Sequence, residues 1–212
     1  MERAGPGGSS PGAGRGLGPS LAGEGLAPDQ KKSRRRGAEI VFVDETGFSF
    51  RDGVATTWAP RGRTPVLKRV SKRRVLSTAI GLTLSGRIYK RHFEHAIRGP
   101  DAVTFLEHLR RQVGTPMIVI WDRLQVHRSR EVKAYVAEHR GLMIEWLPPY
   151  APDLNPEEGC HGNVKQGMKN ALPETVAEIR HHANRGFARL RQRPDLILGF
   201  FHHAGYRVKQ LT

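Results

Sequence analysis

Two apolar runs that each lead into an aspartate constrain this chain more than any other feature of its sequence. Ile40–Val43 is followed by Asp44, and Met117–Trp121 is followed by Asp122. Continuous apolar runs of this length are typical of strands that are covered on both faces of a sheet. A carboxylate directly after such a strand is held rigidly at the edge of the sheet. The sequence therefore predicts a buried sheet with two aspartates at its edge.

The rest of the chain changes from strand patterns to helix patterns. Val54–Trp58 and Val75–Leu84 are predicted strands, and after a turn at Ser85–Gly86 the segment Arg87–Phe93 alternates like a returning strand. Helical spacing then predicts a helix with Asp101 as its N-cap. The later predicted elements are a helix over Arg128–His139, a strand over Leu142–Leu147, a helix beginning near Pro156, and helices over Val176–Leu190 and Leu196–Phe201.

This order of elements predicts an α/β fold, namely a ribonuclease H-like mixed sheet flanked by helices. In that fold the first strand and the fourth strand lie side by side. Asp44 and Asp122 are therefore expected to be neighbours, an inference that rests on the fold class and not on periodicity.

The first part of the chain has a different composition from the rest. Residues 1–37 are rich in glycine, proline and serine and end in the basic cluster Lys31–Arg36. Such a segment buries too little apolar surface to offset its ordering entropy, so we predict a disordered basic tail before a domain that covers residues 38–212. The tail is either a flexible arm that follows phosphates or a solvated linker.

Charge and cysteine content narrow the class of protein. Lysine and arginine total 35 against 20 acidic residues, for a formal charge of +15, which favours an anionic polymer such as nucleic acid as partner. Cys160 is the single cysteine, so no disulfide can form within the chain, as is usual in a reducing compartment. No apolar stretch is long enough to cross a bilayer, and the N-terminus lacks the pattern of a secretory signal.

A third carboxylate, Glu158, ends the segment Leu147–Glu158 at the expected start of a helix. Two aspartates after strands and one acid at a helix start form the arrangement expected of a two-metal phosphoryl-transfer site for Mg²⁺ or Mn²⁺. Each acid alone also has a simpler interpretation. Asp44 can form a turn, Asp122 can cap a helix, and Glu158 can complement a helix dipole.

Three segments resemble one family. They are Val43–Gly47, Trp121–Asp122 with His127 following, and Leu147–Glu158, and they resemble the DDE transposases of the mariner-like superfamily, in particular the bacterial insertion-sequence branch. The resemblance runs from about Glu39 to Lys169. A further short element of the family is matched by Trp58, Pro60 and Gly62.

The resemblance implies that Asp44, Asp122 and Glu158 are a catalytic triad that binds Mg²⁺ or Mn²⁺. The implied reaction is strand cleavage and strand transfer at transposon ends. The implied partners are double-stranded DNA of the transposon ends and of the target, with a homodimer as the expected assembly and no membrane. The implied location is the bacterial cytoplasm, at the nucleoid. Residues 1–37 have no room for the helix-turn-helix modules of the family, so we expect the catalytic part alone.

Departures from the family pattern leave alternatives open. Arg123 stands where the family usually has asparagine, and His161 stands where it usually has tryptophan. The spacing from Asp122 to the glutamate is one residue longer than usual, so Glu157, or less favourably Asp153, is an alternative third ligand. One alternative function is therefore a catalytically inactive, truncated DNA-binding remnant. Another is a ribonuclease H-like nuclease that acts on RNA–DNA hybrids.

Basic residues predict where DNA is contacted. His127 is expected either to orient a ligand of the site or to contact a phosphate. A dense basic stretch around an expected hairpin connection is a further candidate for phosphate contacts, although an exposed loop with a merely solubilising charge has the same composition. Its members are Arg61, Arg63, Lys68, Arg69, Lys72, Arg73 and Arg74.

Overall fold

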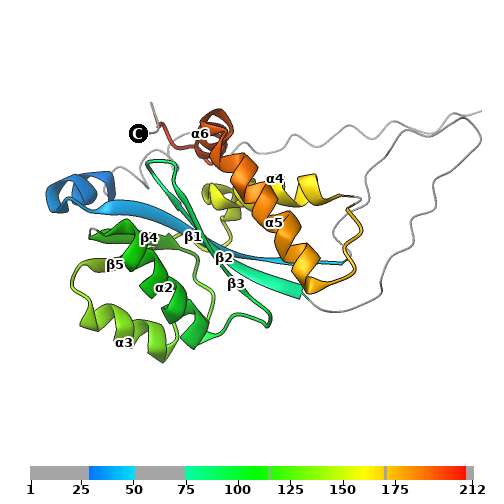
Figure 1. Cartoon of the computed structure of the whole chain (residues 1–212). Helices are drawn as coiled ribbons and strands as arrows, with labels where there is room; N and C mark the ends of the chain where they lie inside the picture. The colour runs from blue at the N-terminus through cyan, green and yellow to red at the C-terminus, as the bar shows by residue number, and fades with distance from the viewer. Residues whose placement is uncertain (1–28, 51–74, 115, 170, 209–212) are drawn as a thin grey trace, which may run out of the picture.

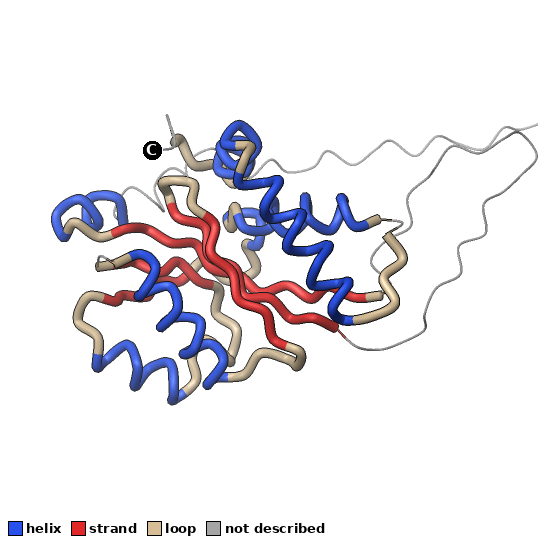
Figure 2. Tube along the Cα trace, viewed as in Figure 1, coloured by secondary structure: helices blue, strands red, loops and turns tan. Residues whose placement is uncertain are grey.

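The computed structural model describes residues 29–50, 75–114, 116–169 and 171–208 of the 212-residue chain. Its centre is a five-stranded sheet (Figures 1 and 2) in the order β3-β2-β1-β4-β5. The strands are β1 Glu39–Ser49, β2 Val75–Thr83, β3 Ile88–Phe93, β4 Met117–Trp121 and β5 Leu142–Trp146. β1, β2 and β3 pair antiparallel, whereas β4 is parallel to both β1 and β5.

Helices cover both faces of this sheet (Figure 1). One layer holds α2 Gly99–Val113 and α3 Arg130–Glu138, and the other holds α4 Glu157–Met168, α5 Val176–Arg191 and α6 Pro194–His203. A short 3-10 helix, Pro152–Leu154, precedes α4. None of the described helices has both the length and the apolar composition that crossing a membrane requires. The predicted ribonuclease H-like fold is confirmed, with β1 and β4 as direct neighbours.

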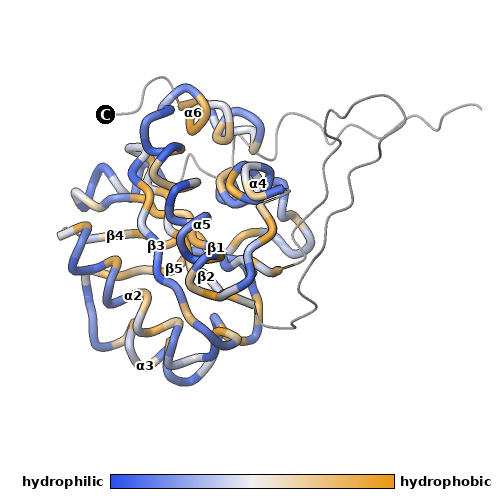
Figure 3. Tube along the Cα trace, turned by 45° about the vertical axis from the view of Figure 1, so that its right-hand side comes forward, coloured by the Kyte–Doolittle hydropathy of each residue, from blue (hydrophilic) through white to orange (hydrophobic). Residues whose placement is uncertain are grey.

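The pleat of the sheet separates two hydrophobic cores, because successive side chains of a strand point to opposite faces. In β1, Ile40 and Phe42 belong to the core beneath α4, α5 and α6, whereas Val41 and Val43 belong to the core beneath α2 and α3. β4 divides in the same way. Figure 3 shows hydrophobic stretches gathered where strands and helices meet in the middle of the molecule. This alternation decides which face each site residue occupies.

The position of Asp44 differs from the expectation. Asp44 does not follow the end of its strand, because β1 continues to Ser49 and pairs with β2 over its whole second half. Thr46 and Phe48 are buried in that extension and give it a reason to remain in the sheet. The shorter neighbour β4 ends at Trp121, so Asp44 still lies at the edge of the parallel part of the sheet.

Smaller differences concern the ends of elements. The predicted N-cap Asp101 is the third residue of the first turn of α2, where its carboxylate accepts the backbone N–H of the true N-cap, Arg98. Ser129 caps α3, which begins two residues later than predicted. Pro156 precedes α4 as its N-cap instead of occupying the first helical position.

Part of the expected tail is helical. Residues 29–36 form a helix, and Lys32 pairs with Glu145 of β5. Its straight-chain lysines and arginines have high helix propensity, which the glycine-rich composition of residues 1–37 as a whole concealed. The predicted strand Val54–Trp58 lies outside the described residues, as do residues 1–28 of the predicted tail.

Candidate functional site

An open cleft of about 600 Å³ lies where β4 and β5 end and α4 begins. Asp44, Asp122 and Glu158 all line it, although they come from three distant parts of the sequence. The carboxyl ends of parallel strands are the usual place for ligand sites in sheets of this kind. The three acids singled out in the sequence are therefore brought into one cleft.

The strand register explains how the two aspartates come to line the same cleft. The parallel pairs of β1 and β4 run from Glu39 with Met117 to Phe42 with Ile120. Continuing this register by two residues places Asp44 beside Asp122. Asp44 has an even number in a strand whose even-numbered residues face α4, so its carboxylate belongs on that face, whereas Asp122 directly follows the end of β4 and lines the cleft from the sheet edge.

Asp44 and Glu158 meet around the imidazole of His161. His161 Nε2 lies 3.1 Å from Asp44 Oδ2 and 3.0 Å from Glu158 Oε2. One ligand atom from each of the three residues lies within 4.8 Å of the others, a spacing that one metal ion can bridge. Carboxylate oxygens suit Mg²⁺ and Mn²⁺, and an imidazole nitrogen is a better ligand for Mn²⁺ than for Mg²⁺.

At the start of α4 the two candidate glutamates face different surroundings, because Glu157 is buried and Glu158 is exposed. The buried face of this helix comprises Glu157, Cys160, His161, Val164 and Met168, which recur at helical spacing. Glu157 is thus the first residue of the face that packs on the sheet and is fully buried, whereas the side chain of Glu158 is 48% exposed in the cleft. Burial, with the charge of nearby Asp44, raises the pKa of Glu157 well above its ordinary value. A protonated, buried acid is a poor metal ligand.

Asn155 fixes the start of α4 to β1. Its amide nitrogen donates to the carbonyl oxygen of Val43 across 3.2 Å, and its amide oxygen accepts the backbone N–H of Glu157 across 3.2 Å. Because Val43 directly precedes Asp44, this link sets the distance between the first aspartate and the helix that carries Glu158. These two hydrogen bonds explain why an asparagine stands directly before Pro-Glu-Glu at the start of α4.

His127 joins Asp122 to a further acid, Glu45. The imidazole is fully buried, with Nδ1 2.5 Å from Asp122 Oδ1 and Nε2 2.8 Å from Glu45 Oε2. It also stacks on Trp121, with ring centroids 3.9 Å apart. His127 therefore contacts a residue of the cleft from behind, which fits the orienting role expected for it better than a phosphate contact.

The protonation of this group follows from its contacts. Burial alone would lower the pKa of His127, but the hydrogen bonds to Asp122 and Glu45 outweigh it and raise the pKa to about 9. Burial acts to raise the pKa of Asp122 as well, yet the hydrogen bonds from His127 and from the Leu124 N–H hold that pKa below its ordinary value. Burial raises the pKa of Glu45. At neutral pH His127 is a cation beside an ionised Asp122.

The sequence did not identify Glu45 as a site residue. The signal was present, because Glu45 follows Asp44 in β1 and must point to the opposite face of the sheet. On that face Trp121 and His127 lie within reach. The sequence alone does not reveal the path of the segment after β4. This path brings His127 back beneath the sheet, where it contacts Glu45.

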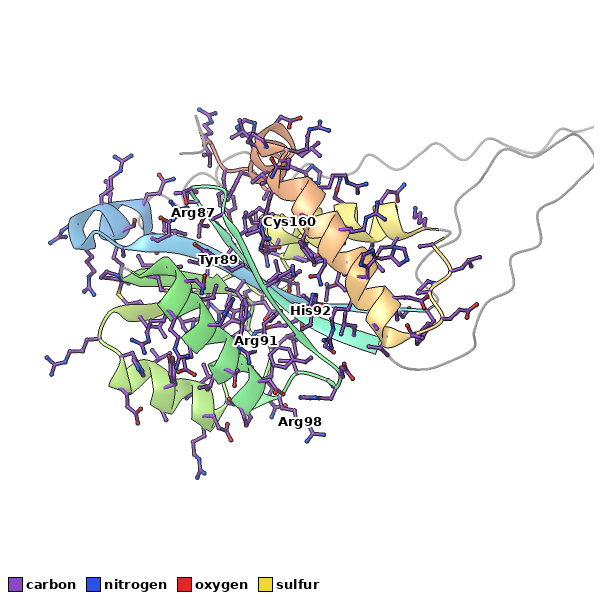
Figure 4. The ribbon with its side chains drawn as sticks, in the orientation of Figure 1. Arg87, Tyr89, Arg91, His92, Arg98 and Cys160 are labelled. Carbon is purple, nitrogen blue, oxygen red and sulfur yellow. The ribbon has the colours of Figure 1, made fainter. Side chains whose placement is uncertain are left out.

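The remaining candidate residues are placed as follows. Asp153 is exposed on the 3-10 helix. Arg123 and Arg128 line the cleft, and Arg123 Nε donates to the carbonyl oxygen of Leu147 across 3.2 Å. Cys160 is buried in α4 (Figure 4), and burial raises the pKa of its thiol, so it is no nucleophile.

Arg61, Arg63, Lys68, Arg69, Lys72, Arg73 and Arg74 lie outside the described residues. In the described part of the chain, three exposed arginines lie just before, within and after the outer strand β3 (Figure 4). They are Arg87, Arg91 and Arg98. β3 is an edge strand, so this basic edge faces away from the rest of the sheet.

Comparisons with known proteins agree with this architecture. Residues 39–180 match the family described as DDE superfamily endonuclease. The search of curated proteins produced no match. The pre-cleavage Mos1 transpososome is similar to this chain with a TM-score of 0.60 and 14% identity, over 94% of this chain and 68% of that one. The Mos1 mariner paired end complex with Mn gives a TM-score of 0.63 and 14% identity, over 96% and 64%.

A third similar structure is the Mos1 transposase catalytic domain with raltegravir and Mn. Its TM-score is 0.54 at 13% identity, over 93% of this chain and 99% of that one. The chain thus spans nearly the whole length of an isolated catalytic domain and about two thirds of the longer chains. At these identities the likeness concerns the fold.

Proposed function

The chain belongs to the DDE superfamily of endonucleases, and on that premise we propose that it is the catalytic domain of a transposase, which cuts and joins DNA strands with divalent metal ions. The observation that carries the proposal is the convergence of Asp44, Asp122 and Glu158 on one cleft. A pair of bound Mg²⁺ or Mn²⁺ ions there would activate the attacking water or 3′-hydroxyl and stabilise the leaving oxygen.

The protein's own part in this reaction is placement. Asp44 Oδ1 accepts the backbone N–H of Glu45, and its other oxygen faces the space beside Glu158 and His161. Asp122 Oδ1 accepts hydrogen bonds from His127 and from the Leu124 N–H. Within the described part of the chain no hydrogen bond reaches Asp122 Oδ2. We propose that His127 is a positioning residue that leaves this oxygen directed at the metal.

Glu158 is the proposed third ligand in preference to Glu157. The cleft reaches Glu158, whereas Glu157 is buried against the sheet, where the Cys160 thiol, a weak donor, is its neighbour and neither oxygen meets a nitrogen or oxygen partner in the described part of the chain. Glu157 therefore keeps a neutral carboxylic acid behind the site. The proposal assigns it no contact with metal or DNA.

Arginine contributes the affinity for DNA. Arg123 and Arg128 are exposed at the cleft, where their guanidinium groups can hold phosphates of the strand that reacts. The basic edge of Arg87, Arg91 and Arg98 would add contacts to the phosphate backbone outside the cleft. Such binding depends strongly on salt and little on sequence.

The finer identity is also a proposal. The motifs after Asp44, Asp122 and Leu147 favour the bacterial insertion-sequence branch, acting on double-stranded transposon ends and target DNA at the nucleoid. Similar structures are described as paired end complexes, which supports a homodimer that holds two ends together.

One contact favours a second candidate function. The imidazole of His161 bridges Asp44 and Glu158, in the space where an ion would join them. If this bridge excludes the ion, the protein binds DNA without cutting it. The two candidates differ in metal-dependent chemistry alone, so one assay separates them.

The test uses labelled duplex DNA that carries the inverted repeats flanking the gene, with Mg²⁺ or Mn²⁺. Wild type is compared with Asp44→Ala and Glu158→Ala, and Glu157→Gln is the matched control. The proposal predicts metal-dependent nicking by wild type and by Glu157→Gln and none by the two alanine variants. Binding without nicking, equal in all four proteins, would establish the inactive DNA-binding protein instead.

A further inference from the structure

Two side chains are unusual for the surface of this molecule. Among the described residues, large hydrophobic side chains are exposed at two positions, Leu124 at 56% and Tyr150 at 103%. Both line the cleft that also holds Asp44 and Asp122. Single exposed apolar residues are common on protein surfaces, but their concentration in the proposed active site points to a ligand with an apolar face.

The sheet topology places these two residues at the same edge of the sheet. β4 and β5 are parallel neighbours whose last pair is Trp121 with Trp146. Leu124 follows the end of β4 by three residues, and Tyr150 follows the end of β5 by four. The Leu124 N–H donates to Asp122 Oδ1 across 3.0 Å, so its backbone is tied to the proposed metal ligand. The apolar surface is thus built into the edge where the reaction would occur.

The backbone at Tyr150 is strained for a residue of its kind. Its φ is +57°, in the left-handed region that costs a residue with a side chain roughly 1–2 kcal/mol. Prolines at positions 148, 149 and 152 restrict the turn around it. In the described part of the chain neither its ring nor its hydroxyl has a partner. The turn therefore holds the ring outward, and no contact among the described residues compensates for the strain of its backbone.

The charges beside the ring indicate what the ligand is. Arg123 and Arg128 line the same cleft, and the hydrogen bond from Arg123 Nε to the Leu147 carbonyl oxygen holds that guanidinium near the turn. An aromatic face next to fixed positive charges is the combination that binds single-stranded nucleic acid, since bases stack on the ring and phosphates meet the arginines. The formal charge of +15 agrees with this partner.

We propose that Tyr150, supported by Leu124, is a stacking site for an unpaired nucleobase next to the phosphate that reacts. The inference rests on the proposed function, which supplies the DNA strand and its orientation toward Asp44 and Asp122. The site takes a base that has left the duplex and, because every base has an aromatic face, it does not read sequence. It thereby favours ends that are open or easily opened.

The experiment compares binding of two DNA probes in EDTA, so that no cutting occurs. One is a blunt hairpin and the other is the same hairpin with a short thymine overhang that contains 2-aminopurine. Wild type is expected to bind the overhang more tightly and to quench its fluorescence. Tyr150→Ala is expected to lose about 5- to 100-fold in affinity for the overhang and to keep its affinity for the blunt hairpin. Tyr150→Phe, which keeps the ring, should stay within about twofold of wild type.

Arg128→Ala is the matched control, because losing a phosphate contact should weaken both probes by the same factor. The inference is overturned if Tyr150→Ala binds both probes like wild type, if it loses both equally, or if Tyr150→Phe behaves like Tyr150→Ala. A wild type that binds neither probe overturns it together with the proposed function.

The nicking assay separates the two ideas. Nicking that depends on Asp44, with overhang binding that is indifferent to Tyr150, leaves the proposed function standing and removes the stacking site. Selective loss of overhang binding in Tyr150→Ala, without any metal-dependent nicking by wild type, leaves the stacking site standing and removes the proposed function.

Discussion

His127 donates a hydrogen bond from Nδ1 to Oδ1 of Asp122 across 2.5 Å, and it does so from a fully buried position behind the cleft. Glu45 holds the other ring nitrogen, and Trp121 packs against the ring. An imidazole held on both sides cannot turn. Asp122 thus has one oxygen fixed by the protein, while the other remains for a ligand.

This relationship predicts an effect of His127 on metal binding. His127→Gln is expected to weaken Mn²⁺ binding by about 10- to 100-fold, because partners behind a metal ligand typically contribute that much to affinity. Isothermal titration calorimetry measures the change. His139→Gln is the matched control, since His139 contacts its own helix backbone at Tyr135. Equal Mn²⁺ affinities in a folded His127→Gln protein and wild type would contradict the positioning role.

The same group predicts how stability depends on pH. His127 has a pKa of about 9 in the folded protein against an ordinary value of 6.5. A raised pKa means that the folded state binds the proton more tightly, so the stabilisation is complete below pH 6.5 and is lost as pH rises through 9. Its size is on the order of a few kcal/mol.

Urea unfolding in EDTA, repeated across that pH range, checks this prediction. The free energy of unfolding of wild type should fall between pH 6.5 and 9 relative to that of His127→Gln. A difference between the two proteins that stays constant across the range would show that His127 gains no proton affinity on folding.

Replacing Glu157 by an apolar residue is expected to increase the stability of the fold. Both of its carboxyl oxygens are buried, and in the described part of the chain neither meets a nitrogen or oxygen partner, so the weak donor Cys160 is all that faces them. Replacing an unsatisfied buried acid by an apolar residue of similar size removes a desolvation cost, so Glu157→Leu should raise the free energy of unfolding by about 1–3 kcal/mol. Chemical denaturation at pH 7 measures this. A loss of stability, or a loss of Mn²⁺ binding, would indicate that Glu157 has a partner or a role that the proposal does not assign.

Alanine substitutions at two glycines of α4 are expected to change the stability in opposite directions. A Cβ at Gly159 would lie 2.5 Å from Phe200 Cδ1 of α6, whereas a Cβ at Gly162 would meet nothing within 4 Å. Gly159→Ala should therefore destabilise the protein by about 1–3 kcal/mol through overpacking. Gly162→Ala should stabilise it by about 0.5–1 kcal/mol through helix propensity. Thermal or urea unfolding of the pair checks both, and the same sign for the two variants would contradict the packing of α6 on α4.

Much of the fold follows from local patterns in the sequence. The apolar runs before Asp44 and Asp122 predict buried strands, because only a covered strand tolerates apolar residues on both faces, whereas the expectation that these strands are neighbours came from the fold class. The order of strand and helix patterns predicts the mixed sheet, and the parallel pairing of β1 with β4 then brings the two aspartates to one cleft. Strand ends were harder to predict. β1 extends past Asp44 because its partner β2 continues, which no pattern within β1 itself reveals.

The parts of the site that sequence reasoning missed depend on contacts between distant segments. Glu45 and His127 meet only after the chain turns behind β4. Whether Glu157 or Glu158 faces the cleft depends on how α4 rotates against the sheet, which the buried stripe from Glu157 to Met168 decides. Tyr150 has no pattern that marks it, because exposure and a positive φ become visible only in three dimensions.

The most direct test of the proposed site is the position of the metal itself. Crystals of the protein soaked in Mn²⁺ and measured near the manganese absorption edge would show each ion as an anomalous peak. The anomalous peaks are expected about 2.1 Å from carboxylate oxygens of Asp44, Asp122 and Glu158, with none at Glu157. Anomalous density absent from this cleft at saturating Mn²⁺, or centred on Glu157, would contradict the assignment of the three acids as metal ligands.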